Sequence, residues 1–374
     1  MLRHCLLLIA FAALPTVAIA QSTAAIGDNT PNRPFSNAIT SLSNDRQTNT
    51  ANTRSSRLKR LPRMYGDSLQ TGSLSFSSDA GSGYLQSPTC GAARIGDNNS
   101  PIPQDRVYFL YQHFHNAVDS TFGPNSRTQS LDLYTLGFEK TFCSERFSLE
   151  MRLPFSSSLA QSDGSVSVTN DSLQSITGVA KAVLLESDDS IFTCGLGISF
   201  PVSDCSSQLK VDEVTTGLGG QSAYFSPFVG YAATLSEQTF VNSFAQLMIP
   251  SGSEFVEVAD SSSSDQGWFR PEEVLVFDIS TGLWLFRDEN APISGIAAML
   301  ELHYSTTLGD DQTASASTSG NSFDFDLQRF DTLNLTSGLH FEIYRTTARV
   351  AAVAPLRDDR FFDAEIHFSL NRNF

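Results

Sequence analysis

The last fifteen residues, "RFFDAEIHFSLNRNF", alternate in polarity from Phe362 to Phe374, with one break at Arg372. Alternation of period two predicts a strand with one apolar face and one polar face. A sheet that contains such a strand must also pair or protect its edges, which restricts the folds open to this sequence. The apolar face carries Phe362, Ala364, Ile366, Phe368, Leu370 and the terminal Phe374, and the polar face carries Asp363, Glu365, His367, Ser369, Asn371 and Asn373.

The same alternation recurs from residue 105 to the end. In "FSLEMRLPF" (147–155) every second residue is apolar, and Glu150 and Arg152 lie between them. A helix would place its apolar residues three or four positions apart, so these stretches predict strands. Twelve of them lie at roughly 105–117, 129–142, 145–157, 171–186, 189–202, 221–235, 238–250, 272–286, 294–307, 327–341, 345–355 and 360–374.

Short and long joins take turns along the chain, so all short joins lie at one end of the sheet. The join "LRDD" after the eleventh strand is the one short member on the long side. The short joins are 143–144, 187–188, 236–237, 287–292 and 342–344, and the long ones are 118–128, 158–170, 203–220, 251–271 and 308–326.

An even number of alternating strands, with one rim of tight turns and one of long loops, predicts an all-β fold, a transmembrane antiparallel barrel of about twelve strands. In a bilayer every backbone polar group needs a partner within the protein, so a spanning sheet must close on itself. A secreted β-sandwich also alternates, with its apolar faces turned inward. Strand and turn together recur here at about 22 residues, and the chain ends on an aromatic residue, Phe374; both favour the barrel. The long loops are expected outside the cell and the tight turns in the periplasm.

Three regions follow from the composition. Residues 1–20, with Arg3, the apolar run "CLLLIAFAAL" and the small residues "AIA", predict a signal peptide and export to the cell outer membrane. Residues 21–104 are rich in Ser, Thr, Asn, Gly and Pro and predict a low-complexity, flexible periplasmic extension. Its basic stretch "RLKRLPR" (57–63) is expected to be a solvated linker, the alternative being a contact with an anionic surface. Residues 105–374 are the predicted barrel.

The net charge of -16 excludes nucleic acid as a partner, because phosphates repel such a surface. The partners expected instead are outer-membrane lipid and lipopolysaccharide, the barrel-assembly machinery, for which Phe374 is the C-terminal signal, and small-molecule solutes. The five long joins contain thirteen Asp or Glu against three basic residues. An acidic mouth of this kind favours the passage of cations.

Parts of the barrel region, such as "YFSPFVGYAATLSEQTFVNSFAQLMIPSG" and "EEVLVFDISTGLWLF", resemble bacterial outer-membrane barrel proteins described as transporters of the MetA phenol-degradation pathway type. The resemblance covers about 105–374. It implies passive uptake of small, often hydrophobic compounds. We therefore expect a channel or transporter for small solutes, hydrophobic or cationic. The alternative is a structural or surface-binding barrel whose long loops contact other molecules.

The polar face of the strands is expected to line the lumen. Twelve strands lie between the eight that leave a packed interior and the sixteen or so that leave an aqueous channel, so an open and a filled lumen both remain possible. The charged and imidazole side chains placed there are Glu139, Glu150, Arg152, Lys181, Asp278, Glu301, His303, Arg349, Asp363, Glu365 and His367.

No motif for catalysis, a cofactor or a metal is present, so the chain is not expected to be an enzyme. "HFH" places His113 and His115 on one strand face, a spacing that can hold a metal, but the sequence offers no third ligand. Histidines beside aromatic residues at the membrane interface are the commoner case. Cys90 and Cys143 are both expected on the periplasmic side, where an oxidising compartment permits a disulfide between them.

Overall fold

A computed structural model describes residues 58, 60–67, 71–78, 81–88, 92–122, 125–156, 160–163, 166–170, 175–202, 206–211, 214–220, 222–318 and 322–374. They fall within one compact unit, Thr53–Phe374. The predicted signal peptide, residues 1–20, and residues 21–57 lie outside the described residues. Within the described part of the chain, no helix is long and apolar enough to cross a membrane.

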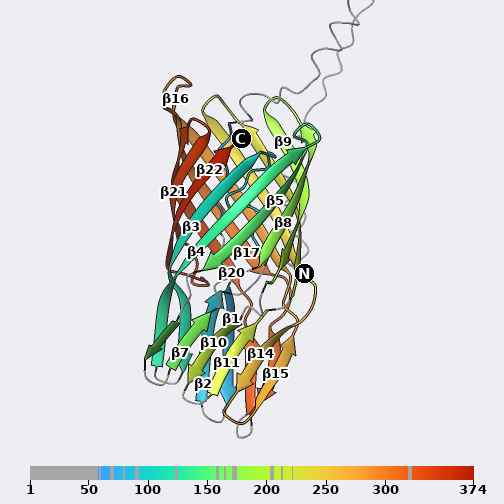
Figure 1. The fold of residues 1–374 in the computed structure, drawn as a ribbon, viewed down its shortest axis with the longest axis vertical. Coiled ribbons are helices and arrows are strands. Elements are labelled where there is room, and N and C mark those ends of the chain that lie inside the picture. The colour runs from blue at the N-terminus through green and yellow to red at the C-terminus, as the bar shows by residue number, and fades with distance from the viewer. Residues whose placement is uncertain are drawn as a thin grey trace, which may run out of the picture. The chain divides into compact units, whose positions relative to one another are not determined.

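Twelve antiparallel strands form a closed barrel, as the sequence predicts (Figure 1). The last strand pairs with the first, in a register that runs from Ala364 opposite His115 to Asn373 opposite Arg106. The barrel strands are β3 (Arg106–Phe122), β4 (Asn125–Phe142), β5 (Phe147–Ser156), β8 (Ile176–Glu186), β9 (Ser190–Phe200), β12 (Tyr224–Thr234), β13 (Thr239–Pro250), β16 (Val274–Arg287), β17 (Ile293–Thr307), β20 (Asp331–Ile343), β21 (Thr346–Pro355) and β22 (Ala364–Asn373).

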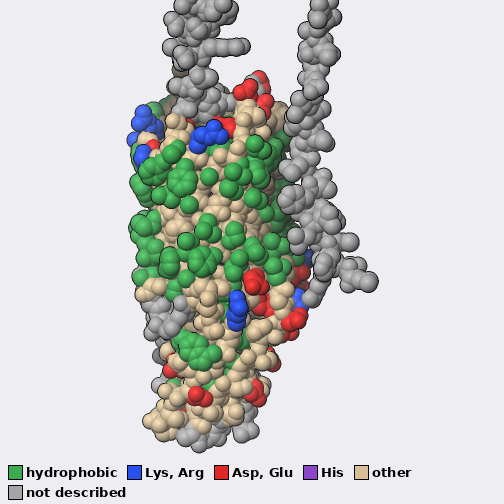
Figure 2. Space-filling model, turned by 90° about the vertical axis from the view of Figure 1, so that its right-hand side faces the viewer, with side chains coloured by type: hydrophobic (Ala, Val, Ile, Leu, Met, Phe, Trp, Pro, Cys, Tyr) green, Lys and Arg blue, Asp and Glu red, His purple; other side chains and the backbone are tan. Residues whose placement is uncertain are grey.

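The barrel wall is apolar outside and polar inside. Along β22, Ile366, Phe368 and Leu370 are exposed, whereas Glu365 and His367 are buried. Figure 2 shows hydrophobic side chains covering the barrel wall, with charged ones toward its two ends. Soluble proteins bury their apolar faces, so this inverted pattern is that of an outer-membrane barrel. Phe362, which the alternation placed on the outer face, precedes β22 and is buried against Phe114 and Phe361.

The long joins are largely strands, which corrects the expectation of loops. β3 and β4 extend beyond the barrel and almost meet, and four further hairpins rise at the same end (Figure 1). These hairpins have short strands, and some, such as "QTASAS", lack the large apolar side chains by which the barrel strands are recognised. They are β6 (Ala160–Asp163) with β7 (Val166–Asn170), β10 (Ser206–Val211) with β11 (Val214–Gly219), β14 (Glu254–Ala259) with β15 (Ser264–Phe269), and β18 (Gln312–Ser317) with β19 (Ser322–Leu327).

A fifth hairpin at this end comes from the N-terminal extension. β1 (Thr71–Ser78) pairs with β19, and β2 (Gly81–Pro88) pairs with β3. We call the five hairpins and the outer ends of β3 and β4 the cap. Its core is built from several hairpins and contains Phe76, Leu85, Val118, Leu218, Val256, Val258, Phe269, Ala314, Ala316, Phe323 and Phe325.

The opposite end of the barrel carries the tight turns. Here the terminal Phe374 stacks on Phe138, with 5.8 Å between ring centroids and 16° between planes. The ammonium of Lys140 lies 5.3 Å from the Phe374 ring and pairs with Asp105 at 2.5 Å. The last residue thus joins the first strands of the barrel at the seam that closes it.

Candidate functional site: the filled barrel interior

Two runs of the N-terminal extension fill the barrel interior. Residues 58 and 60–67 run from the tight-turn end toward the cap, and residues 92–104 return from the cap to the first barrel strand. We call these residues the plug. Most of its side chains are buried, among them Leu58, Met64, Tyr65, Ile95, Asn98 and Asn99, each with no exposed surface.

This location contradicts the expected periplasmic extension for these residues. The composition of 21–104 is too polar to form a core of its own, which is why it reads as loosely ordered. The plug does not need its own core, because the barrel wall supplies one. The basic stretch 57–63 is likewise not a solvated linker at Arg60 and Arg63, since both contact barrel residues.

One side of the interior wall is apolar. At the tight-turn end, Leu58, Leu61 and Ile102 of the plug pack in one cluster with Phe240 and Trp284. A second cluster joins Met64 and Ile95 of the plug to Val179, Phe228 and Phe244. A third, which contains Tyr224, Met248 and Val276, receives Ala92. The plug is therefore held in part by the burial of apolar surface.

Polar residues of the wall bind mainly the plug backbone. Both carboxylate oxygens of Glu301 accept from the Tyr65 amide, at 3.0 and 2.9 Å, and one of them accepts from the Gly66 amide at 3.1 Å. Gln246 accepts from the Ile95 amide at 2.7 Å and donates to the Ala93 carbonyl at 3.0 Å. Hydrogen bonds of this kind satisfy a segment that has no regular secondary structure.

A buried network of charged side chains on the opposite wall also donates hydrogen bonds to the plug backbone. Arg106 pairs with Glu139 at 2.7 Å and with Glu150 at 3.1 Å, and Arg152 also pairs with Glu150. Each cation reaches the plug as well: Arg106 donates to the Asn98 carbonyl at 2.6 Å, Arg152 to the Arg94 carbonyl at 2.9 Å, and Lys181 to the Ser100 carbonyl at 2.6 Å. Burying several charges is tolerated because each has opposite charges and hydrogen bonds around it.

The plug also has internal structure. The Met64 amide donates to the Asn99 carbonyl at 2.8 Å, and the Asn98 amide to the Tyr65 carbonyl at 2.9 Å. Between these contacts Gly66 has φ +84°, and a Cβ there would lie 2.2 Å from the Asp97 Cα. Only glycine fits this crossing of the two runs.

Ten of the eleven side chains assigned to the lumen are buried inside the barrel, and most of them contact the plug or a residue that does. His303, for instance, lies 2.8 Å from Asp278 and 3.3 Å from Glu301. Arg349 donates to the Met64 carbonyl at 2.7 Å and lies over the Tyr65 ring. The eleventh, Asp363, precedes β22, is exposed and pairs with Arg360 at 3.0 Å. Of the two possibilities left open by the strand count, the described residues form the filled interior.

Several residues of this site are not evident from the sequence. Arg106 and Tyr108 lie on the inner face of β3, where "VYFLYQHF" is apolar on both faces and hides the alternation. Arg94 and Asp67 form a plug ion pair at 2.8 Å, and Asp67 also accepts from Asn334 at 2.6 Å. The one sequence signal for the plug residues is the basic stretch "RLKRLPR" (57–63), which interrupts an extension rich in Ser, Thr, Asn, Gly and Pro.

The Cys90–Cys143 disulfide stays a prediction, because Cys90 lies outside the described residues. Within the described part of the chain, Cys143 is free and exposed in its tight turn. Ala92 packs with Tyr224 and Val276 near the cap, whereas Cys143 is at the opposite end of β4.

The two histidines of "HFH" have separate partners. His113 lies 2.8 Å from Asp132, which also accepts from the Tyr111 hydroxyl at 2.9 Å. His115 lies 3.3 Å from the Ser130 hydroxyl. No group of three His, Cys, Asp or Glu side chains in the described residues is placed to hold a metal ion.

Comparisons with protein families and with curated proteins gave no match. Among solved structures, an outer membrane channel from Pseudomonas putida F1 is similar, with a TM-score of 0.47, 12% identity and coverage of 73% of this chain and 96% of that one. The translocator domain of the autotransporter NalP from Neisseria meningitidis has a TM-score of 0.46, 10% identity and coverage of 72% and 89%. The Pseudomonas putida toluene transporter TodX has a TM-score of 0.38, 8% identity and coverage of 72% and 88%. At these scores the likeness carries no argument about cargo or mechanism.

Proposed function

We propose that this protein is a passive outer-membrane channel for small solutes and that the plug must shift for solutes to pass. The proposal contains no catalytic step and no cofactor. Its environment is outer-membrane lipid with lipopolysaccharide on the outer side, reached by way of the barrel-assembly machinery. Hydrophobic or cationic solutes are the expected cargo, the former from the sequence resemblance and the latter from the acidic long joins.

The observation that carries the proposal is the way in which the wall binds the plug. Lys181, Arg152 and Glu301 each bind backbone groups of the plug. Water can replace such hydrogen bonds when the plug moves. Shifting the plug would therefore leave a wetted wall with charges of both signs on one side and aromatic residues such as Phe244 and Trp284 on the other.

A disulfide between plug and wall tests the proposal. A Cβ built on Gly96 would lie 3.5 Å from the Cβ of Asp278 on β16, within the range of about 3.5–4.5 Å found in disulfides. Gly96→Cys with Asp278→Cys, in a background whose four mature-region cysteines are serine, would fix the plug without adding bulk. Liposome uptake and planar-bilayer conductance would be measured before and after reduction.

We expect the oxidised protein to be closed and the reduced protein to pass solutes. The two single-cysteine proteins, treated with the same oxidant, control for loss of the Asp278 carboxylate and for oxidation itself. Equal passage through oxidised and reduced protein would show that the plug need not move. No passage through either state, with the single-cysteine proteins also silent, would reject the channel.

The second candidate is a structural or surface-binding barrel. The described interior and the cap core are both packed, and that observation favours a barrel without transport. Silence of every variant in the bilayer experiment, together with correct membrane insertion, would select this function.

A further inference from the structure

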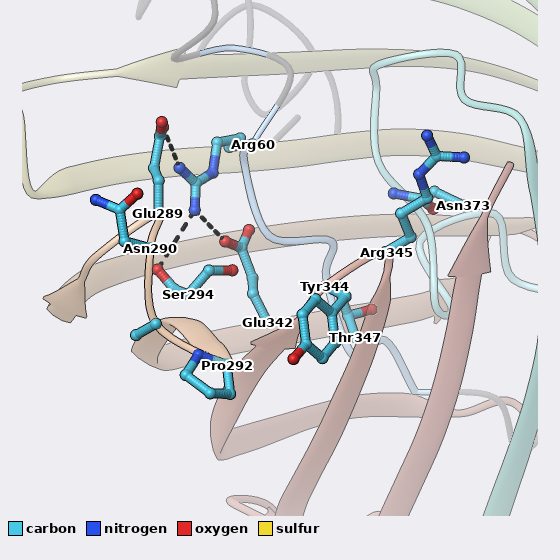
Figure 3. A pocket seen from close by; sticks show the side chains of 11 residues that line it. Arg60, Glu289, Asn290, Pro292, Ser294, Glu342, Tyr344, Arg345, Thr347 and Asn373 are labelled. Atoms are coloured by element: carbon cyan, nitrogen blue, oxygen red, sulfur yellow. Dashed lines mark hydrogen bonds and ion pairs between the residues drawn. The ribbon is translucent and has the colours of Figure 1, made fainter.

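A pocket of about 450 Å³ lies at the tight-turn end, where the plug enters the barrel (Figure 3). Its walls come from the β16–β17 turn, the end of β20, the β20–β21 turn and Arg60 of the plug. It is a separate place from the buried interior, because it opens to the surface of the barrel end.

One end of the pocket already binds a guanidinium. Arg60 reaches Glu342 at 2.6 Å, Glu289 at 2.7 Å and the Ser294 carbonyl at 3.4 Å. Figure 3 shows both carboxylates pointing toward the Arg60 head group. Two carboxylates and a carbonyl around one planar cation make a recognition site for guanidinium or ammonium groups, with Arg60 as its internal ligand.

The other end is basic. Arg345 lies beside Asn373 across the pocket from Glu289 (Figure 3) and is exposed. Behind Asn373, the buried Arg63 contacts only the neutral groups of Asn373 at 2.8 Å, Thr347 at 3.5 Å and Gln104. Its Nε has no hydrogen-bond partner, and neither Arg63 nor Arg345 forms an ion pair within the described part of the chain.

Tyr344 lies between the two ends. It is 79% exposed and has φ +55°, a conformation that a bulky residue seldom adopts. Together with Pro292 it gives the pocket an apolar wall. An acidic end, an apolar wall and a basic end stand in the order needed for a short dipolar molecule.

We propose that this pocket binds a small dipolar solute with a guanidinium or ammonium group at one end and a carboxylate at the other, the chemistry of a basic amino acid. The cationic group replaces Arg60 between Glu289 and Glu342, and the carboxylate lies at Arg345. Binding then frees the plug at its entrance. This last step rests on the proposed channel function, whereas binding itself does not.

Competition with Arg60 gives the proposal an unusual signature. A tethered group competes at an effective concentration in the millimolar range or above. Removing it by Arg60→Gln should therefore tighten binding of the solute, by about tenfold if Arg60 occupies its site nine-tenths of the time. A substitution that only damages the fold would weaken binding.

The test is calorimetric titration of the full-length protein in detergent with L-arginine and with agmatine, which lacks the carboxylate. Arg60→Gln should tighten the binding of both L-arginine and agmatine. Arg345→Gln should weaken the binding of L-arginine but not that of agmatine, whose terminal ammonium Arg345 repels, and Glu342→Gln should weaken the binding of both. If neither the wild type nor Arg60→Gln binds L-arginine at millimolar concentration, or if Arg345→Gln affects both probes equally, the proposal is overturned.

Failure of the channel would look different. L-arginine would then bind with the predicted pattern and have no effect on the conductance of any variant. Binding without conductance would support the proposed binding site and reject the channel function. Conductance without binding would support the channel function and reject the binding site.

Discussion

Glu301→Gln should loosen the plug without changing its shape. The carboxylate of Glu301 accepts three contacts from the Tyr65 and Gly66 amides and also lies 3.0 Å from the Ser280 hydroxyl and 3.3 Å from His303. Gln has the same outline but only one acceptor oxygen and no charge. Its amide nitrogen would face a plug amide that also donates.

The expected size follows from these contacts. A hydrogen bond to a charged group contributes about 1.5–3 kcal/mol, and an unsatisfied buried donor costs about 1–3 kcal/mol. With one neutral acceptor retained, the loss in plug binding is about 2–4 kcal/mol. Since about 1.4 kcal/mol is a factor of ten, the undocked population should rise about 30- to 700-fold.

Hydrogen exchange followed by mass spectrometry measures this population directly, in the peptide that contains Tyr65 and Gly66. Exchange there should accelerate in Glu301→Gln by the factor above. Glu365→Gln is the matched control, because Glu365 is equally buried on β22 but accepts only from Gln112, at 2.9 Å, and from no plug amide. Unchanged exchange in Glu301→Gln, or equal acceleration in both variants, would refute the idea that Glu301 holds the plug.

Three further expectations concern other parts of the chain. An epitope tag at Ser262, in the β14–β15 turn, should be reachable on intact cells and one at Asp188, in a tight turn, should not; the opposite result would invert the topology. Burial raises the pKa of Glu254 in the cap to about 7, so the folded state keeps a proton that the unfolded state loses above about pH 4.5. Cap stability should fall by about 3 kcal/mol as the pH rises from 4.5 to 7 and then level off, and Glu254→Gln should remove this dependence in hydrogen exchange of β14. Ile279→Arg, on the lipid face, should cost about 2–4 kcal/mol in folding equilibria in lipid vesicles, and a cost near zero would show that this face does not meet the membrane.

The barrel could be predicted from the sequence because the pattern of a strand is contained in neighbouring residues. Most strands show their two faces within ten residues, as Ile366 and Glu365 do on neighbouring positions, and β3 is an exception. The short joins then fix the order of the strands. The ten buried polar residues follow from the same alternation. The prediction that Asp363 lines the lumen was wrong because β22 begins one residue after it.

The plug could not be predicted, because its stability lies in residues far from it in sequence. Tyr65 and Glu301 are 236 positions apart, and Asn98 and Arg349 are 251 apart. A short stretch of the extension gives no information about the barrel residues that bury it. The cap hairpins were missed for another reason: Ser315 and Asp324 bond across β18 and β19, but each strand has only six residues, and β18 is too polar to stand out from a loop.

The course of the plug also sets an order of events during assembly. The β1–β2 hairpin pairs with β19 and β3 in the cap, while the chain on both sides of it runs through the barrel to the tight-turn end. The β1–β2 hairpin, whose strands have eight residues each, must therefore reach the cap end before β22 pairs with β3. Otherwise it must be threaded through a closed barrel that is already lined by Phe240 and Trp284. The β3–β22 seam joins residues as far apart as Arg106 and Asn373, which makes it a slow contact to form. That delay leaves the ring open while the first part of the chain takes its place inside.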